Sequence, residues 1–187
     1  LVSAARIWWM LRTFGAARVR VLDGGLPAWR AAGGSLESGP RSSPTPGRFR
    51  ARFDLDAVAD RTEVAAATEA GVQVLDARSA GRFAGTAPEP RPGLRGGHMP
   101  GACNLPFADI LMADSTMKRG AALEAAFRAA GIDPDRPVIT SCGSGVTAAV
   151  LSLGLAELGR PSRLYDGSWA EWGGRDDTAI EATPAGL

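Results

Sequence analysis

The stretch from Val138 to Leu151 reads VITSCGSGVTAAVL, and it predicts a strand, a short loop and a helix in direct succession. The β-branched run at 138–140 favours a strand, and the alanine-rich run that starts at Thr147 favours a helix. Cys142 lies in the loop between them, where two glycines permit backbone angles that other residues avoid. Loop N–H groups and a helix N-terminus would place partial positive charge beside its sulfur, and the thiolate is the reactive form of cysteine. The pattern therefore nominates Cys142 as a nucleophile rather than a buried structural thiol.

Strands and helices alternate along the chain, which predicts an α/β fold with a parallel sheet of about five strands flanked by helices. Short strands are expected at residues 72–75, 102–105, 138–140 and 163–165, and helices at 121–130, from 147 onward, and from Asp54 or Asp56 to about Glu69. Reactive loops in such sheets lie at the carboxyl ends of the strands. Cys142 and Asp76 both follow strands, so we expect both at that edge, with Asp76 fixing the geometry of its loop.

A pattern near the start of the chain recurs near its end. A helical run that ends at Gly15 is followed by a short strand at 20–22, an Asp-Gly turn and a helix that contains tryptophan. A second helical run ends at Gly159 and is followed by a strand at 163–165, another Asp-Gly turn and another tryptophan-containing helix. Because the spacing of the two copies is that of a domain, the repeat predicts two related domains.

The repeat also suggests domain boundaries. We expect residues 1–34 to be the end of a first domain and residues 35–52 to be a linker rich in proline, glycine and serine. Residues 53–187 are expected to be the catalytic domain. Leu1 already lies inside an apolar helical pattern, so we expect the chain to be a fragment of a longer protein.

Composition argues against several classes of protein. The formal net charge is only +1 and no dense basic run occurs, so no nucleic-acid partner is expected. The longest mainly apolar stretch, at 146–158, is too short to span a bilayer, so no membrane partner is expected. The two cysteines, Cys103 and Cys142, favour a reducing cytoplasm over a disulfide scaffold, and Cys103 is expected to pack as a small apolar residue. The single histidine, His98, cannot build a zinc site and is expected in a surface loop, so neither metal nor cofactor is expected.

Five segments together carry a resemblance to a known family. They are CGSGVT at 142–147, VLDAR with RFAG between 74 and 85, EPRPG at 89–93, GHMPGA at 97–102 and YDGSWAEW at 165–172. These segments resemble the motifs of the rhodanese superfamily, and specifically those of its 3-mercaptopyruvate sulfurtransferases. The resemblance implies a rhodanese-like fold, and a tandem-domain protein of which most of the N-terminal rhodanese domain is missing here.

The resemblance also implies a mechanism. Cys142 attacks the sulfur of the donor and becomes a persulfide, and an acceptor thiol, thioredoxin or cyanide then removes that sulfur. Ser144 matches a serine that relays a proton to the leaving enolate, and the His and Asp partners of that serine belong to the preceding domain. An alternative role for Ser144 is to cap the helix that follows the loop.

Two arginines and the remaining loop residues are the expected donor-binding groups. Arg82 and Arg91 match positions that hold the carboxylate and keto groups of the donor. A planar guanidinium forks onto a carboxylate through paired hydrogen bonds, which a lysine cannot do. The loop residues expected to contact the donor are Gly143, Gly145, Val146 and Thr147.

Charge inside the loop bears on the choice of donor. Residues 143–146 carry no charge, which favours monoanionic mercaptopyruvate over the thiosulfate dianion. A thiosulfate:cyanide sulfurtransferase remains an alternative, and so does a non-catalytic rhodanese-like binding module, because half of an active site between domains would be absent. A phosphatase is disfavoured, since the position six residues after the cysteine holds Ala148 where phosphate binding needs an arginine.

Overall fold

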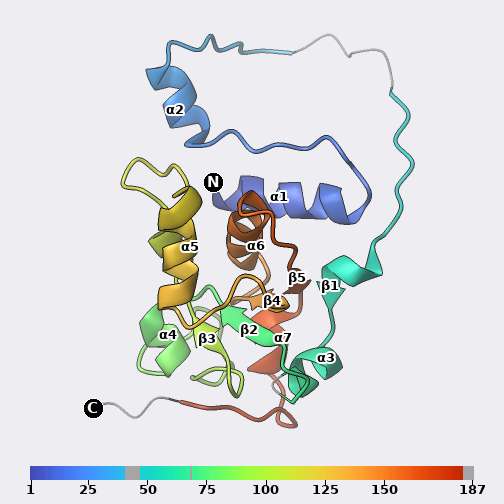
Figure 1. Cartoon of the computed structure of the whole chain (residues 1–187), viewed down its shortest axis with the longest axis vertical. Coiled ribbons are helices and arrows are strands. Elements are labelled where there is room, and N and C mark those ends of the chain that lie inside the picture. The colour runs from blue at the N-terminus through green and yellow to red at the C-terminus, as the bar shows by residue number, and fades with distance from the viewer. Residues whose placement is uncertain (41–46, 68, 183–187) are drawn as a thin grey trace.

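A five-stranded parallel sheet forms the centre of the structure, a computed structural model that describes residues 1–40, 47–67 and 69–182. The strand order is β1-β5-β4-β2-β3, and each pair of neighbours is parallel (Figure 1). The strands are β1 (Val58–Ala59), β2 (Gln73–Asp76), β3 (Cys103–Asn104), β4 (Val138–Ser141) and β5 (Arg163–Tyr165). This architecture confirms the predicted α/β class and the parallel sheet of about five strands.

Helices cover both faces of the sheet. The α-helices are α1 (Val2–Thr13), α2 (Gly25–Ala31), α3 (Arg61–Ala66), α4 (Ala80–Ala84), α5 (Gly120–Ala129), α6 (Ala148–Glu157) and α7 (Ser168–Trp172), and the 3-10 helices are η1 (Leu55–Ala57) and η2 (Phe107–Ile110). Successive strand residues point to opposite faces, so Leu75 packs with α1, α5 and α6, whereas Val74 packs with α3 and α7. Two apolar layers therefore enclose the sheet, as parallel sheets require.

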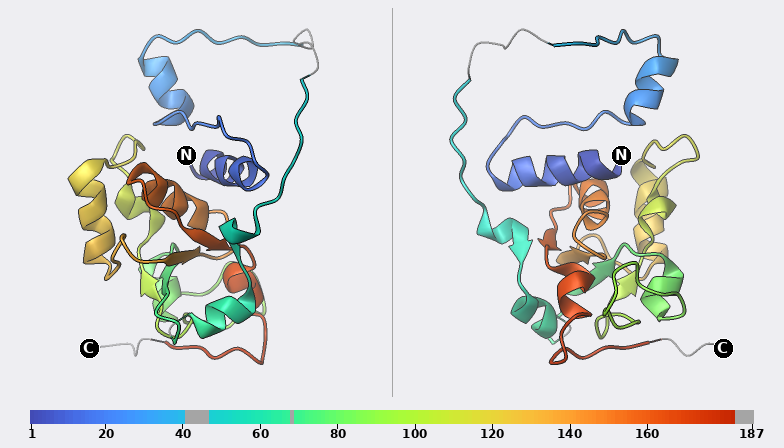
Figure 2. Two further views of the ribbon diagram at one scale, coloured as in Figure 1. Left: turned by 45° about the vertical axis from the view of Figure 1, so that its right-hand side comes forward. Right: turned by 180° about the vertical axis from the view of Figure 1, so that it is seen from behind.

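Helix α6 is the central helix of one layer. Residues 148–155 are all buried, because the sheet covers one side of α6 while α1 and η2 cover others. Helix α1 lies across α6 (Figures 1 and 2), and its Ala5 and Trp9 belong to the same apolar cluster as Leu151. The first helix of the chain is thus part of the core that supports the sheet.

The segment after α2 leaves this core and returns to it at the end of α1, where the N–H groups of Arg52 and Asp54 donate to the carbonyls of Phe14 and Thr13 at 2.9 and 2.8 Å. Residues 35–40 and 47–54 form neither helix nor strand, and Figure 2 shows residues 35–40 and 47–51 outside the sheet and its helices. Residues 41–46, at the middle of the predicted linker, lie outside the described residues. Helix α2 has no buried residue, and its Trp29 is 42% exposed.

Two predicted elements are wrong. Residues 20–22 form no strand; the following residue, Asp23, instead accepts hydrogen bonds from the backbone N–H of Met117 and from Arg119, each at 2.9 Å. The stretch 54–69 is not one helix, because Val58 pairs with Leu164 of β5 and interrupts it. Asp54 caps only the short 3-10 helix η1, and the α-helix begins after Asp60, whose carboxylate and backbone N–H exchange hydrogen bonds with Glu63 in a capping box.

Candidate active site

The loop that follows β4 carries Cys142 at the carboxyl edge of the sheet, as predicted. Cys142 is 1% exposed, and its backbone N–H donates to Oγ of Ser168 at 3.2 Å. Two loop carbonyls, those of Cys142 and Gly143, accept hydrogen bonds at 2.9 Å from the N–H groups of Trp169 and Ala170. The first turn of α7 therefore holds the backbone of the loop.

These hydrogen bonds set the direction of the loop amides. In a planar trans peptide the N–H points opposite to the C=O, so a carbonyl directed at α7 turns the next N–H away from that helix. Consistent with this, the N–H of Ser144 donates to Sγ of Cys142 at 3.4 Å. A backbone donor thus faces the sulfur, an arrangement that stabilises negative charge on it.

A pocket of about 220 Å³ opens beside the sulfur. Its walls are formed by Arg82, Glu89, Pro90, Arg91, Leu94, Cys142, Gly143, Ser144, Val146 and Thr147. Every predicted site residue except Gly145 lines this pocket. Gly145 is directed elsewhere: it has φ of +75°, and a Cβ on it would come within 2.7 Å of Oδ1 of Asp166.

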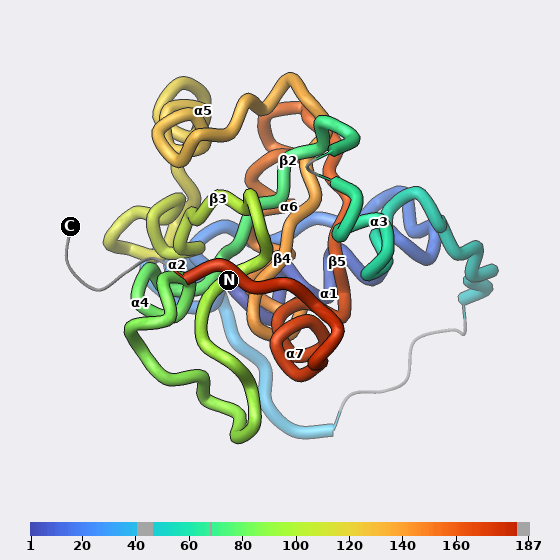
Figure 3. Tube along the Cα trace, turned by 90° about the horizontal axis from the view of Figure 1, so that it is seen from below, coloured from blue at the N-terminus to red at the C-terminus, as the bar shows by residue number. Residues whose placement is uncertain are grey.

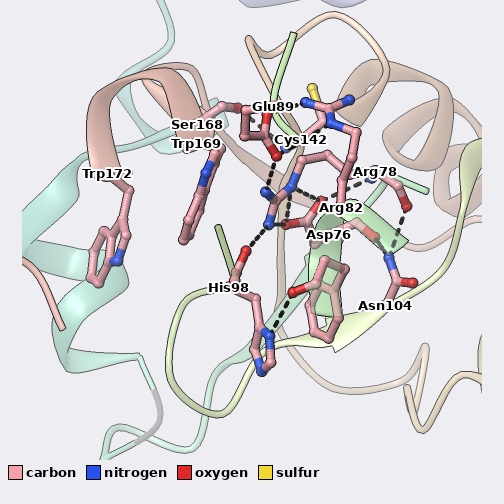
Figure 4. Close-up of polar contacts among 12 residues, drawn as sticks. Asp76, Arg78, Arg82, Glu89, His98, Asn104, Cys142, Ser168, Trp169 and Trp172 are labelled. Atoms are coloured by element: carbon pink, nitrogen blue, oxygen red, sulfur yellow. Dashed lines mark hydrogen bonds and ion pairs between the residues drawn. The ribbon is translucent and has the colours of Figure 1, made fainter. Parts of the chain in front are cut away.

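The guanidinium of Arg82 lies against the loop (Figure 4). Its Nε and Nη2 donate to Glu89 at 3.2 and 2.6 Å. A Cβ on Gly143 would come within 2.7 Å of Nη2, so the glycine leaves the space that the guanidinium occupies. This position, next to Cys142, suits an arginine that binds the anionic end of a donor.

Glu89 belongs to a buried ionic network that the sequence did not reveal. Its side chain is 1% exposed and also pairs with Arg78, whose Nη1 lies 2.8 Å away. Arg78 is held in turn by Asp76 at 2.7 Å, by the carbonyl of Gly97, and by stacking over Trp169 at 4.2 Å (Figure 4). The expected role of Asp76 in loop geometry fits this arrangement. The missed signal was the Asp-x-Arg sequence at 76–78, whose aspartate ends β2.

The segment that carries these arginines packs against α7. Figure 3, which looks at this end of the molecule, shows the chain after α4 passing beside α7. Nε1 of Trp169 donates to the carbonyl of Arg95 at 2.9 Å, and the N–H of Arg95 donates to the carbonyl of Gly173 at 3.1 Å. Helix α7 therefore supports both walls of the pocket, the cysteine loop and the arginine segment.

Arg91 is exposed and contrasts with Arg82. Within the described residues its guanidinium has no hydrogen bond or ion pair, although it lines the pocket. Among the described residues, the charged side chains that line the pocket are two arginines, Arg82 and Arg91, and one carboxylate, Glu89. The surplus is one positive charge, which matches a monoanionic ligand better than a dianion.

The helix-cap alternative for Ser144 is wrong. The N-cap of α6 is Thr147, and its side chain makes no capping hydrogen bond. Ser144 instead lines the pocket, and among the described residues its hydroxyl has no hydrogen-bond partner. The hydroxyl is thus available to a bound molecule.

His98 and Cys103 lie outside the pocket. The expectation that His98 occupies a surface loop is wrong, because it is 8% exposed, stacks on Phe83 with ring centroids 3.8 Å apart, and has Nδ1 2.9 Å from the Phe83 carbonyl. Cys103 is a half-buried free thiol that packs against the main apolar cluster. Burial raises the pKa of the Cys103 thiol.

In residues 1–40, 47–67 and 69–182, none of the helices is long and apolar enough to cross a membrane. The same residues bring together no group of three or more His, Cys, Asp or Glu side chains that could hold a metal ion.

Comparison with known proteins gave consistent matches. The rhodanese-like domain family matches residues 60–175. The chain is 48% identical over 183 residues to a 3-mercaptopyruvate sulfurtransferase of Escherichia coli, covering 97% of this chain and 64% of that protein. It is 39% identical over 209 residues to thiosulfate/3-mercaptopyruvate sulfurtransferase 1 of Arabidopsis thaliana, covering 97% of this chain and 54% of that protein.

A solved structure agrees with the sequence matches. The crystal structure of SseA from Escherichia coli, described as a 3-mercaptopyruvate sulfotransferase with the rhodanese fold, superposes with a TM-score of 0.78 at 45% identity. The match covers 90% of this chain and 63% of SseA. The chain therefore spans less than two thirds of the length of these relatives.

Proposed function

Because this chain belongs to the rhodanese family, we propose that it moves a sulfane sulfur from 3-mercaptopyruvate, through a persulfide on Cys142, to an acceptor. The observation that carries the proposal is the pocket in which Cys142, Arg82 and Arg91 meet. The pocket is small and holds a nucleophile beside two cations, as an anionic sulfur donor requires. The sulfurtransferase relatives support the same chemistry.

The proposed reaction has two halves. In the first, the thiolate of Cys142 attacks the sulfur of mercaptopyruvate, the donor C–S bond breaks, and its electron pair forms the enolate of pyruvate. A proton then converts that enolate to pyruvate, and Ser144, whose hydroxyl lines the pocket, is proposed to relay it. In the second half, an acceptor thiolate attacks the outer sulfur of the persulfide and releases Cys142 as a thiolate.

Binding of the donor is assigned to the two arginines and the loop. Arg82 and Arg91 bind its carboxylate and keto oxygens, since charge-assisted guanidinium hydrogen bonds are short and strong. Gly143, Val146 and Thr147 line the rest of the pocket and face the donor. Gly145 contributes through backbone conformation, because its φ of +75° turns the loop.

The surplus of one positive charge favours mercaptopyruvate as donor. Thiosulfate, a dianion, is the alternative, and the Arabidopsis relative is named for both compounds. The binding-module alternative is supported by exposed apolar side chains on α1, where Ile7, Met10 and Leu11 are at least 38% exposed. Exposed apolar side chains of this kind are typical of a surface that contacts another protein.

We further propose the domain division and the setting of the reaction. Residues 1–34 are assigned to the end of a first rhodanese-like domain, 35–52 to a linker and 53–187 to the catalytic domain. Thioredoxin, a small thiol or cyanide accepts the sulfur, and a reducing cytoplasm suits the two free cysteines. Limited proteolysis that cuts first within residues 35–52 would support the division, and uniform resistance there would contradict it.

The decisive experiment is intact mass spectrometry of the chain after incubation with each donor. We expect the chain to gain the mass of one sulfur atom with mercaptopyruvate. A smaller fraction of the chain should gain it with thiosulfate, and Cys142→Ser should gain none with either donor. Preferential gain with thiosulfate would reverse the donor assignment. A folded chain that gains sulfur from neither compound would favour the binding module.

A further inference from the structure

Arg6 of α1 reaches the catalytic loop from the other end of the chain. Its Nη1 donates to the carbonyl of Gly145 at 3.3 Å across a separation of 139 positions. The same nitrogen pairs with Oδ1 of Asp166 at 2.6 Å, and the guanidinium lies 4.7 Å from the centre of the Trp9 ring. The Arg6 side chain is only 21% exposed, so these contacts hold it in place.

The contact with Gly145 completes a pattern of outward-held carbonyls. Helix α7 binds the carbonyls of Cys142 and Gly143, while Arg6 binds that of Gly145. Since N–H and C=O oppose each other in a trans peptide, these three bonds orient the N–H groups of residues 143, 144 and 146 away from their anchors. The N–H of Ser144 is seen donating to Sγ of Cys142, and Val146 lines the same pocket.

Glycine at 145 is what allows Arg6 to approach. A Cβ there would lie 3.0 Å from Nη1 of Arg6 and 2.7 Å from Oδ1 of Asp166, and the φ of +75° is one that other residues rarely adopt. The backbone and the arginine are therefore fitted to each other. Arg6 also lies outside residues 60–175, the part that matches the rhodanese-like domain, so the matched domain alone would lack this support.

We propose that Arg6 is a positioning residue for sulfur transfer, which keeps the peptide between Gly145 and Val146 oriented so that the Val146 N–H faces the sulfur of Cys142. A fixed N–H stabilises negative charge on that sulfur without a cost of reorganisation during the reaction. The role in catalysis rests on the proposed sulfurtransferase function. The effect on Cys142 itself does not require a donor.

The first test is a single-turnover measurement of persulfide formation in the full chain, wild type against Arg6→Ala. We expect the maximal rate to fall about tenfold, less than the loss when an oxyanion donor is removed outright, because the peptide is freed rather than deleted. The donor concentration that gives half the maximal rate should change by less than about twofold, since Arg82 and Arg91 are untouched. Arg6→Lys should recover part of the rate.

A matched control lies on the same helix. Among the described residues Arg12 donates a side-chain hydrogen bond to the carbonyl of Ala17 alone, at 2.9 Å, so Arg12→Ala should leave the rate unchanged. A folded Arg6→Ala variant with the wild-type rate, or one that weakens donor binding alone, would overturn the proposal.

A second measurement needs no donor. In a Cys103→Ser background, the rate of Cys142 alkylation by iodoacetamide should fall about tenfold in Arg6→Ala, since the sulfur loses an oriented N–H. If the wild type gains no sulfur from any donor but this fall is seen, the proposed function fails and the role of Arg6 stands. Should Arg6→Ala not fold, Asp166→Asn replaces it, because it weakens the anchor of Arg6. An unchanged alkylation rate in that variant would overturn the proposal.

Discussion

Arg82 and Glu89 face each other through two parallel hydrogen bonds, from Nε at 3.2 Å and from Nη2 at 2.6 Å. This fork uses two of the three guanidinium nitrogens, and in the part of the chain that the structure describes Nη1 makes no hydrogen bond and is open to a ligand. Because the carboxylate is 1% exposed, water screens the pair little. Glu89 thus determines which edge of the Arg82 guanidinium faces the pocket.

Glu89→Gln should weaken both the fold and donor binding. The amide keeps the shape but loses charge-assisted bonds to Arg78 and Arg82, so the free energy of unfolding should fall by about 2 kcal/mol in urea titrations. The KM for mercaptopyruvate should rise about tenfold as Arg82 loses its orientation. Glu124→Gln, which breaks an exposed pair with Arg128 on α5, is the control and should change stability by less than about 0.5 kcal/mol. Equal effects of both variants would contradict this account.

Gly143→Ala should displace Arg82 without touching the arginine itself. A Cβ would come within 2.7 Å of Nη2, and the guanidinium must move because the loop backbone is held by α7. Steady-state kinetics should show a KM for mercaptopyruvate raised about tenfold, the size expected for one misplaced charge-assisted contact. Gly47→Ala, where no atom lies within 4 Å of the added methyl, should leave KM unchanged. An unchanged KM in Gly143→Ala would remove Arg82 from the donor site.

Arg91→Ala should weaken donor binding without changing the stability of the fold. Within the described part of the chain Arg91 has no ion-pair partner, so its loss should leave the thermal unfolding midpoint unchanged. Loss of a charge-assisted hydrogen bond to the donor should lower kcat/KM about 10- to 100-fold, and lysine should restore only part of it. Full activity of Arg91→Ala would show that Arg82 alone holds the donor.

Cys103 should impose a pH dependence on stability in the alkaline range. Burial raises the pKa of this thiol above its ordinary value of 9.0, so the unfolded chain releases the proton at lower pH than the folded chain does. The contribution to stability is therefore complete below about pH 9 and declines as the pH rises through the folded pKa. Urea titrations between pH 8 and pH 11 should show a steeper loss of stability in the wild type than in Cys103→Ala. Parallel curves would contradict the raised pKa.

Local signals were sufficient for much of the fold. Residues 138–151 carry β-branched, glycine and alanine runs in the order that β4, the loop and α6 require, and β5 coincides with the predicted 163–165. The prediction of one helix over 54–69 was wrong. Alanines and acidic residues favour a helix along the whole stretch, but Val58 pairs with Leu164 at the edge of β5 and forms a strand instead. The prediction of a strand at 20–22 was also wrong. A strand is stable only when it pairs with a neighbouring strand, and the local sequence does not show whether such a neighbour exists.

In the site, too, local sequence predicted some residues and missed others. Cys142 and its loop were predictable because loop, strand and helix are contiguous. The pairing of Glu89 with Arg78 and Arg82 depends on how the segment after α4 folds back, which residue spacing does not encode. His98 was misplaced for a similar reason, since it pairs with Glu181, far along the chain, and stacks on Phe83.

The position of α1 across α6 also bears on the order of folding. Ala5 and Trp9 cannot reach their cluster until α6 has been made, and contacts of such long range form slowly because a large loop must close first. During synthesis α1 therefore cannot pack against α6 until the sheet strands and α6, which follow it in the chain, have been made. Trp9→Phe should accordingly speed unfolding while leaving the folding rate unchanged in stopped-flow experiments, whereas slower folding would place α1 in the folding nucleus. Helix α1 would then dock after the sheet and α6, although it precedes both in the chain.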